Sequence, residues 1–103
     1  GNAPCTTPRA LALQMTQELE GKPVLCGAGR PETLTLETVF EYNDGEWSIG
    51  PTDDKKRARL PPCIRDVFIP AATTRLKALW KQVHEIDLRV DVRAFYKLTL
   101  TLK

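Results

Sequence analysis

The side chains that most often carry catalysis are few in this 103-residue chain, which holds one histidine and one serine. Ser48 lies within a predicted strand, not at the sharp strand-to-helix turn that exposes a nucleophilic serine. His84 ends a predicted helix, where an imidazolium complements the helix dipole. If residues 63–84 were one helix, Cys63 and His84 would stand about 30 Å apart, too far for a nucleophile–base pair. The carboxylates are scattered, and no pair suggests the acid and base of a glycosidase. We therefore expect a protein that is not an enzyme, with no catalytic residue, cofactor or metal.

The three cysteines, Cys5, Cys26 and Cys63, are an odd number, so at most one disulfide forms within the chain. They lack the short spacing of a zinc or redox site. One interpretation is that all three are small buried apolar residues, and the other is a bridge in an oxidising compartment. We favour a Cys5–Cys26 bridge, which would fasten both ends of the helix between them, over Cys26–Cys63. Spacing alone does not fix the connectivity. Cys63 is then the free thiol, either buried or available for an intermolecular bridge.

The first of two predicted helical regions covers residues 8–20. Thr7 is a suitable N-cap, Pro8 fits the first helical position, and Gly21 fits the left-handed conformation that often ends a helix. Apolar residues recur between them at helical spacing. This pattern predicts an amphipathic helix that packs on a core.

The second helical region is interrupted by a proline. Apolar residues keep one face through residues 63–84, but Pro70 lies inside that stretch. A proline in a helix interior costs about 3 kcal/mol, because it lacks an N–H and clashes with the preceding turn. We expect a short helical turn at 63–68 and a main helix at about 71–84, kinked or broken at Ile69-Pro70.

Alternating apolar and polar residues predict the strands. A short strand at 24–26 precedes a turn at 27–31, and residues 34–42 alternate with period two up to Asn43-Asp44-Gly45, a strong hairpin signal. Residues 46–50 return, and the alternation resumes over 86–102. The order α-β-β-β-α-β predicts a single α+β domain over residues 1–103, with a mainly antiparallel sheet and two helices on one face.

The last predicted strand is too long to lie straight in its own domain. At about 3.3 Å per residue it would span about 55 Å, whereas a chain of this size has a diameter near 35 Å. We favour a bend or bulge around Arg93-Ala94-Phe95 over pairing with a second copy. In antiparallel pairs centred on Val90 or Val92, opposite charges would face each other. The candidate interface residues are Asp87, Arg89, Val90, Asp91 and Arg93.

The segment 51–62 is predicted to be an exposed loop, because prolines bound it and charges fill it. Its basic residues, Lys55, Lys56, Arg57 and Arg59, are a candidate anion-binding site for a glycan, a lipid headgroup or nucleic acid. Nucleic acid is the least favoured, because the run is short, adjoins Asp53-Asp54 and contains no aromatic residue to stack on bases. A solvated loop is the simpler interpretation.

The N-terminal residues Asn2-Ala3-Pro4-Cys5 are typical of a mature chain after removal of a signal peptide, and Gly1 is interpreted as a cloning remnant. With its three cysteines and small α+β body, the chain resembles small exported proteins of unknown function from Gram-negative bacteria. That resemblance implies a periplasmic or secreted location.

Several functions fit this description. We expect a non-enzymatic exported protein that acts through protein contacts, on itself as a homodimer or on host or competitor cells, with the C-terminal strand as its edge. The alternatives are an anion binder and a periplasmic enzyme inhibitor that inserts the loop at 27–31 or 51–62. No apolar run is long enough to cross a bilayer.

Overall fold

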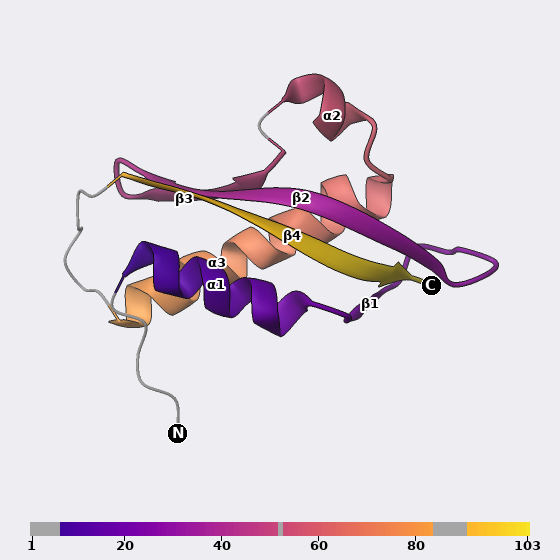
Figure 1. The fold of residues 1–103 in the computed structure, drawn as a ribbon, viewed down its shortest axis with the longest axis horizontal. Coiled ribbons are helices and arrows are strands. Elements are labelled where there is room, and N and C mark those ends of the chain that lie inside the picture. The colour runs from indigo at the N-terminus through magenta and orange to yellow at the C-terminus, as the bar shows by residue number, and fades with distance from the viewer. Residues whose placement is uncertain (1–6, 52, 84–90) are drawn as a thin grey trace.

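Two helices lie against one face of a four-stranded sheet in the computed structural model, which describes residues 7–51, 53–83 and 91–103 (Figure 1). In chain order the elements are α1 (Pro8–Leu19), β1 (Pro23–Val24), β2 (Glu32–Asn43), β3 (Glu46–Gly50), α2 (Asp54–Ala58), η1 (Cys63–Phe68), α3 (Ile69–Val83) and β4 (Val92–Leu102). Helix α1 packs mainly against β4 and α3 against β3, whereas α2 lies on the other side of the strands. The predicted α+β class is confirmed.

The strand order is β1-β4-β2-β3, so β4 lies inside the sheet although it follows the other strands in sequence. Strand β4 is antiparallel to β2, and β2 is antiparallel to β3. The short strand β1 is parallel to β4, which makes the sheet mixed, though still mainly antiparallel. Within the described residues, none of the helices has the length and apolar character needed to cross a membrane.

Local signals place α1 where the sequence predicts it. The Thr7 hydroxyl accepts a hydrogen bond from the Ala10 N–H at 3.1 Å, and Pro8 occupies the first turn, where a missing N–H has no cost. Gly21 has φ +74°, a conformation that glycine adopts without strain. Leu11 and Met15 on one side of the helix are buried in the core.

The predicted hairpin is also confirmed. Asp44 and Gly45 both have positive φ, as a tight two-residue turn between β2 and β3 requires. Trp47 is buried, and its ring lies 5.1 Å from Tyr42 and 5.8 Å from Trp80 of α3, measured between centroids. This aromatic cluster joins the hairpin to α3.

The predicted interruption near Pro70 takes the form of a wide turn. Residues of η1 form a π-helix, and the Ile69 N–H donates to the Ile64 carbonyl, five residues earlier. The wider turn suits Pro70, because a proline clashes with the carbonyl four residues before it in a regular α-helix. The short helix and the main helix are therefore both present, joined without a gap at Ile69.

Most of the described residues between 53 and 62 are exposed, as predicted, but Pro51 is buried and the segment is not simply a loop. It contains α2, a helix of five residues that the Asp53 carboxylate caps by accepting from the Lys55 and Lys56 N–H groups. The aspartate interpreted as part of a charged loop is thus the residue that starts a helix.

Alternation along β4 is confirmed where the strand is described. Ala94, Leu98 and Leu100 face the core, whereas Phe95 on the opposite face is 68% exposed. The ladder with β2 pairs one residue with one from Val92 to Leu102, so the bulge predicted at 93–95 is not present. The alternation continues unbroken because Phe95 occupies a regular position on the outer face. The predicted strand residues 86–90 lie outside the described residues.

The core lies between the sheet and the two long helices. Its buried apolar side chains come from every layer of this sandwich. They include Leu11, Ala12, Met15, Leu36, Phe40, Tyr42, Trp47, Ile49, Ile64, Ile69, Ala72, Leu76, Trp80, Ala94, Leu98, Leu100 and Leu102.

Candidate interaction site

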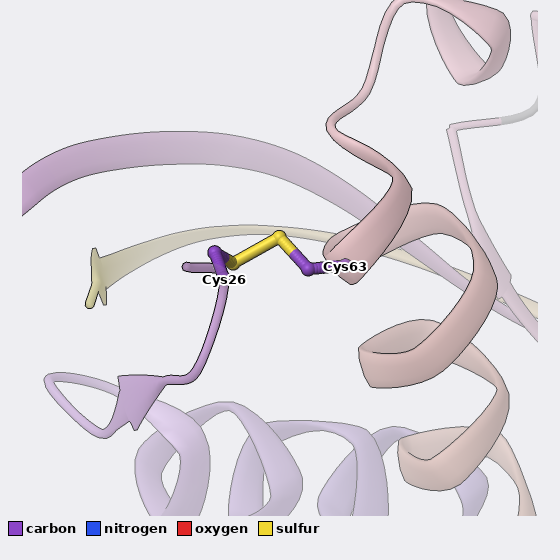
Figure 2. The surroundings of a disulfide bond; sticks show 2 residues. All are labelled: Cys26 and Cys63. Carbon is purple, nitrogen blue, oxygen red and sulfur yellow. A yellow bond between two sulfur atoms is a disulfide. The ribbon is translucent and has the colours of Figure 1, made fainter. Parts of the chain in front are cut away.

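A disulfide joins Cys26, just after β1, to Cys63, the first residue of η1 (Figure 2). The predicted Cys5–Cys26 bridge is therefore wrong, and so is the prediction that Cys63 is a free thiol. The 12 residues of α1 separate its two ends by about 18 Å, whereas bridged Cα atoms lie about 4.4–6.8 Å apart. A bridge fastening both helix ends would oppose this geometry. Cys5 lies outside the described residues.

The catalytic candidates weighed from the sequence do not assemble into a site. Ser48 is exposed in β3, and His84 lies outside the described residues. Within the part of the chain that is described, no group of three or more histidine, cysteine or acidic side chains could hold a metal ion.

The structure divides the predicted anion-binding residues. Lys55 and Lys56 of α2 are exposed, and so is Arg59, which follows the helix as its C-cap. Arg57 turns inward instead and donates to the carbonyl oxygens of Ile49 at 3.3 Å and Pro51 at 3.2 Å. Three of the four cations are thus available to solvent, and the fourth holds α2 against the end of β3.

Arg57 also borders a second basic feature that sequence spacing did not reveal. A hollow of about 360 Å³ between β3 and the start of α3 is lined by Arg57, Arg65 and Lys77, together with serine and threonine hydroxyls. Arg65 is held by a bidentate pair with Asp66, and Lys77 lies 3.5 Å from Glu46. The cations come from three different elements, so no local charge run indicates them.

One side of β4 is the clearest candidate for an interaction site. Strand β2 pairs with β4 from Val92 to Leu102, but β1 pairs with it at Thr101 and Leu102 alone. Among the described residues, no strand lies beside β4 on that side between residues 92 and 98. An edge of this kind presents backbone N–H and C=O groups that can bond to an added strand.

Side chains and a turn already bond to this edge at both of its ends. The Arg9 guanidinium donates to the Arg93 carbonyl at 3.4 Å. At the other end the Thr99 N–H donates to the Glu20 carboxylate at 3.0 Å, and the Thr99 carbonyl accepts from the Gly21 N–H at 3.0 Å. Because backbone groups alternate in direction along a strand, the N–H and C=O of Phe95 and Lys97 also face this side.

Two exposed apolar side chains flank the edge. Phe95 is on the outer face, where the Arg93 guanidinium carbon lies 5.7 Å from its ring centroid. Leu13 of α1 is 43% exposed and stands one turn after Arg9, whose side chain reaches the edge. An added strand would therefore meet apolar surface on both of its faces.

Phe95 also borders a hollow on the outer face of the sheet. The hollow measures about 350 Å³ and lies between β2 and the segment that carries α2. Val39 and Leu60 contribute apolar surface, and Lys56 contributes a cation. The predicted basic run and the outer face of β4 thus border the same depression.

The candidate interface residues have separate outcomes. Asp87, Arg89 and Val90 lie outside the described residues. Asp91 accepts a hydrogen bond from the Asp44 N–H at 3.3 Å. Arg93 pairs with Glu41 at 2.8 Å, across the ladder inside the same molecule. The charge alternation that suggested pairing between chains is therefore satisfied at Arg93 by β2.

Two ion pairs on the helical side perturb the ionisation of their members. Arg75 of α3 hydrogen-bonds to Glu18 of α1 and holds the pKa of that carboxyl below its ordinary value. Arg65 lowers the pKa of the Asp66 carboxyl in the same way, through hydrogen bonds to it. These are exposed contacts between neighbouring elements, not the acid and base of a reaction.

Sequence reasoning overlooked Leu13 and the residues that bond to the two ends of the edge. Phe95 did give a signal, because it is the apolar exception among the odd-numbered positions of the strand. Comparisons with protein-family models, with curated proteins and with solved structures gave no match.

Proposed function

We propose that this is an exported, non-enzymatic protein that acts through protein contacts, and that the partner adds a strand to the free side of β4. The observation that supports this function is the edge at residues 92–98, with the exposed Phe95 at its centre. Added strands gain affinity from main-chain hydrogen bonds and specificity from alternate side chains. The hollow beside Phe95 offers a place for one such side chain.

Natural sheets protect free edges with charges, prolines or bulges, because an unprotected edge pairs with other chains. This edge has Arg93 and Lys97 on its outer face but neither a proline nor a bulge from Val92 to Leu102. It is also short, because Thr99 is already bonded to the end of α1. A partner would therefore contribute a short extended segment.

The disulfide supports an exported location. Disulfides persist in the periplasm and outside cells, whereas cytosolic thiols are kept reduced. Alkylation of the unreduced protein followed by mass analysis should label one thiol per chain. Three labelled thiols would remove the main argument for export.

Binding can be tested by panning a library of random peptides of about eight residues against the oxidised protein. Selected peptides are then measured by fluorescence anisotropy against Phe95→Lys and against Val67→Lys. Val67 is 65% exposed on η1, so the second variant is a matched control. We expect Phe95→Lys to abolish binding and Val67→Lys to preserve it. Peptides that bind both variants equally would overturn the proposed site.

A second candidate function, binding of an anionic polymer, is favoured by three exposed cations, two on α2 and the third, Arg59, at its C-cap. Affinity for heparin should then fall steeply with salt. It should be lost when Lys55, Lys56 and Arg59 become alanine. A matched variant that removes Lys22, Arg30 and Lys103 should retain it. Equal losses in both variants would indicate attraction by net charge alone.

A further inference from the structure

We propose that the strand added to β4 comes from a second copy of this chain, antiparallel and centred on Ala94. This inference rests on the proposed function and specifies its partner. Two features of the edge bear on the register of this pair, namely the hydrogen bonds that it already makes and its charges.

Hydrogen bonds already made by the edge limit where a symmetric pair can be centred. The bonds from Thr99 to Glu20 and Gly21 close the edge at that residue, so the last free position is Lys97. Toward the start of β4, the longer bond from the Arg9 guanidinium to the Arg93 carbonyl, 3.4 Å, would be displaced by a partner strand. A two-fold antiparallel pair with Ala94 on its axis places Asp91 to Lys97 of both copies in the ladder and leaves Thr99 outside it, since the same residues then lie on both strands.

The charges fit this register. With Val92 on the axis Asp91 would face Arg93, whose charge Glu41 already pairs within the same chain. With Ala94 on the axis, Asp91 lies opposite Lys97 of the second copy, and this pair occurs twice. Arg93 lies opposite the second Phe95, a contact of the kind already formed within one chain. With Phe95 on the axis, Arg93 would instead face Lys97, and with Arg93 on the axis it would face itself. Like charges directly opposite each other destabilise a ladder.

The apolar residues beside the edge also lie near this axis. Helix α1 runs in the same direction as β4, because Arg9 contacts Arg93 and Glu20 contacts Thr99. Leu13 is about 6 Å along α1 from Arg9, and Phe95 is a similar distance along β4 from Arg93. Both therefore stand close to the level of Ala94. Pairing would cover apolar side chains that are 43% and 68% exposed in one chain.

A single cysteine on the axis tests the register. In this register Ala94 faces Ala94 of the second copy as a non-hydrogen-bonded pair, whose Cα atoms lie about 4.5 Å apart, within reach of a disulfide. The variant Ala94→Cys is made with Cys5→Ser, and diamide serves as the two-electron oxidant. Val92→Cys in the same background is the matched control, because it reports the neighbouring register centred on Val92. We expect rapid covalent dimers from Ala94→Cys and none from Val92→Cys.

Charge reversal gives a second readout that does not depend on new thiols. Sedimentation equilibrium over a range of concentrations should show dimers of the unmodified chain. Asp91→Lys or Lys97→Asp should each weaken dimerisation by roughly tenfold. The double variant should restore much of it, and thermal unfolding of dilute protein checks that each variant is folded.

The outcomes separate this inference from the proposed function. A monomer at all concentrations, with no cross-link at Ala94, overturns the self-pairing. Peptide binding that still depends on Phe95 would leave the proposed function standing. Cross-linking through Val92 in place of Ala94 would also overturn the inference, because the register would be different.

Discussion

Strand β4 has bonded neighbours on both sides at residues 99–102, whereas at residues 92–98 it has β2 alone among the described strands. At the C-terminal end, the Lys103 N–H donates to the Val24 carbonyl and the Cys26 N–H donates to the Lys103 carbonyl. The disulfide then joins Cys26 to η1. At the N-terminal end, the described part of the chain reaches the free side through a side-chain hydrogen bond from Arg9. One strand thus combines an end fastened on both sides with an end that is open on one side, where we propose that a partner binds.

Removing the disulfide should have the largest effect on the difference between the two ends of β4. The bridge spans 37 residues of sequence, and closing such a loop is worth about 4 kcal/mol in the chain-entropy model. A Cys26→Ser/Cys63→Ser double variant should lose about that much free energy of unfolding in urea. Cys5→Ser is the control. Amide exchange should rise at Cys26 and Lys103 more than at Ala94 and Tyr96, and an equal rise at both ends would contradict the comparison.

Truncating one side chain from each end of β4 should have very different costs. Leu100 has no exposed surface, so Leu100→Ala should lower the free energy of unfolding by about 2–5 kcal/mol. Phe95→Ala should change it by no more than about 0.5 kcal/mol. Urea denaturation of both variants measures the difference. Similar losses would show that Phe95 supports the fold and is not reserved for a partner.

Removing the hydrogen bond between the Thr99 N–H and the Glu20 carboxylate should lower the free energy of unfolding by a smaller amount. Glu20→Ala removes the carboxylate that accepts from the Thr99 N–H, and we expect a loss of about 1 kcal/mol. Amide exchange at Thr99 should rise toward that of Lys97. Gln17→Ala, on the exposed side of the same helix, should leave both measurements unchanged.

The smallest effect concerns pH and the pair between α1 and α3. Arg75 holds the pKa of Glu18 below its ordinary value of 4.5 when the chain is folded. The folded state therefore binds that proton less readily than the unfolded state, so the stabilisation is present above 4.5 and is lost as the pH falls through the lowered value. The melting temperature of the parent should exceed that of Glu18→Gln near neutrality and approach it in acid. A constant gap across the range would contradict this assignment.

Features set by neighbouring residues could be predicted from the sequence. The N-cap at Thr7, the turn at Asp44-Gly45 and the alternation of β4 each depend on residues within a few positions. The partner of Cys26 in the disulfide could not be predicted from the sequence, because it depends on β1 lying beside β4 and on where η1 begins. The free side of β4 depends on strand order in the same way. The helix at Asp54–Ala58 was missed although its signal was local, because Asp53 was interpreted as a charge and not as a cap.

The central place of β4 also bears on the order in which the chain can fold. Strands β1 and β2 are not neighbours, and each is bonded to β4, which follows both of them in sequence. Among the described strands, the partner of β1 emerges only with residues 101 and 102, and until β4 is made β2 can pair with β3 alone. An isolated hairpin is marginally stable in water. The four-stranded sheet of the described residues can therefore be completed only after the last strand of the chain has been made.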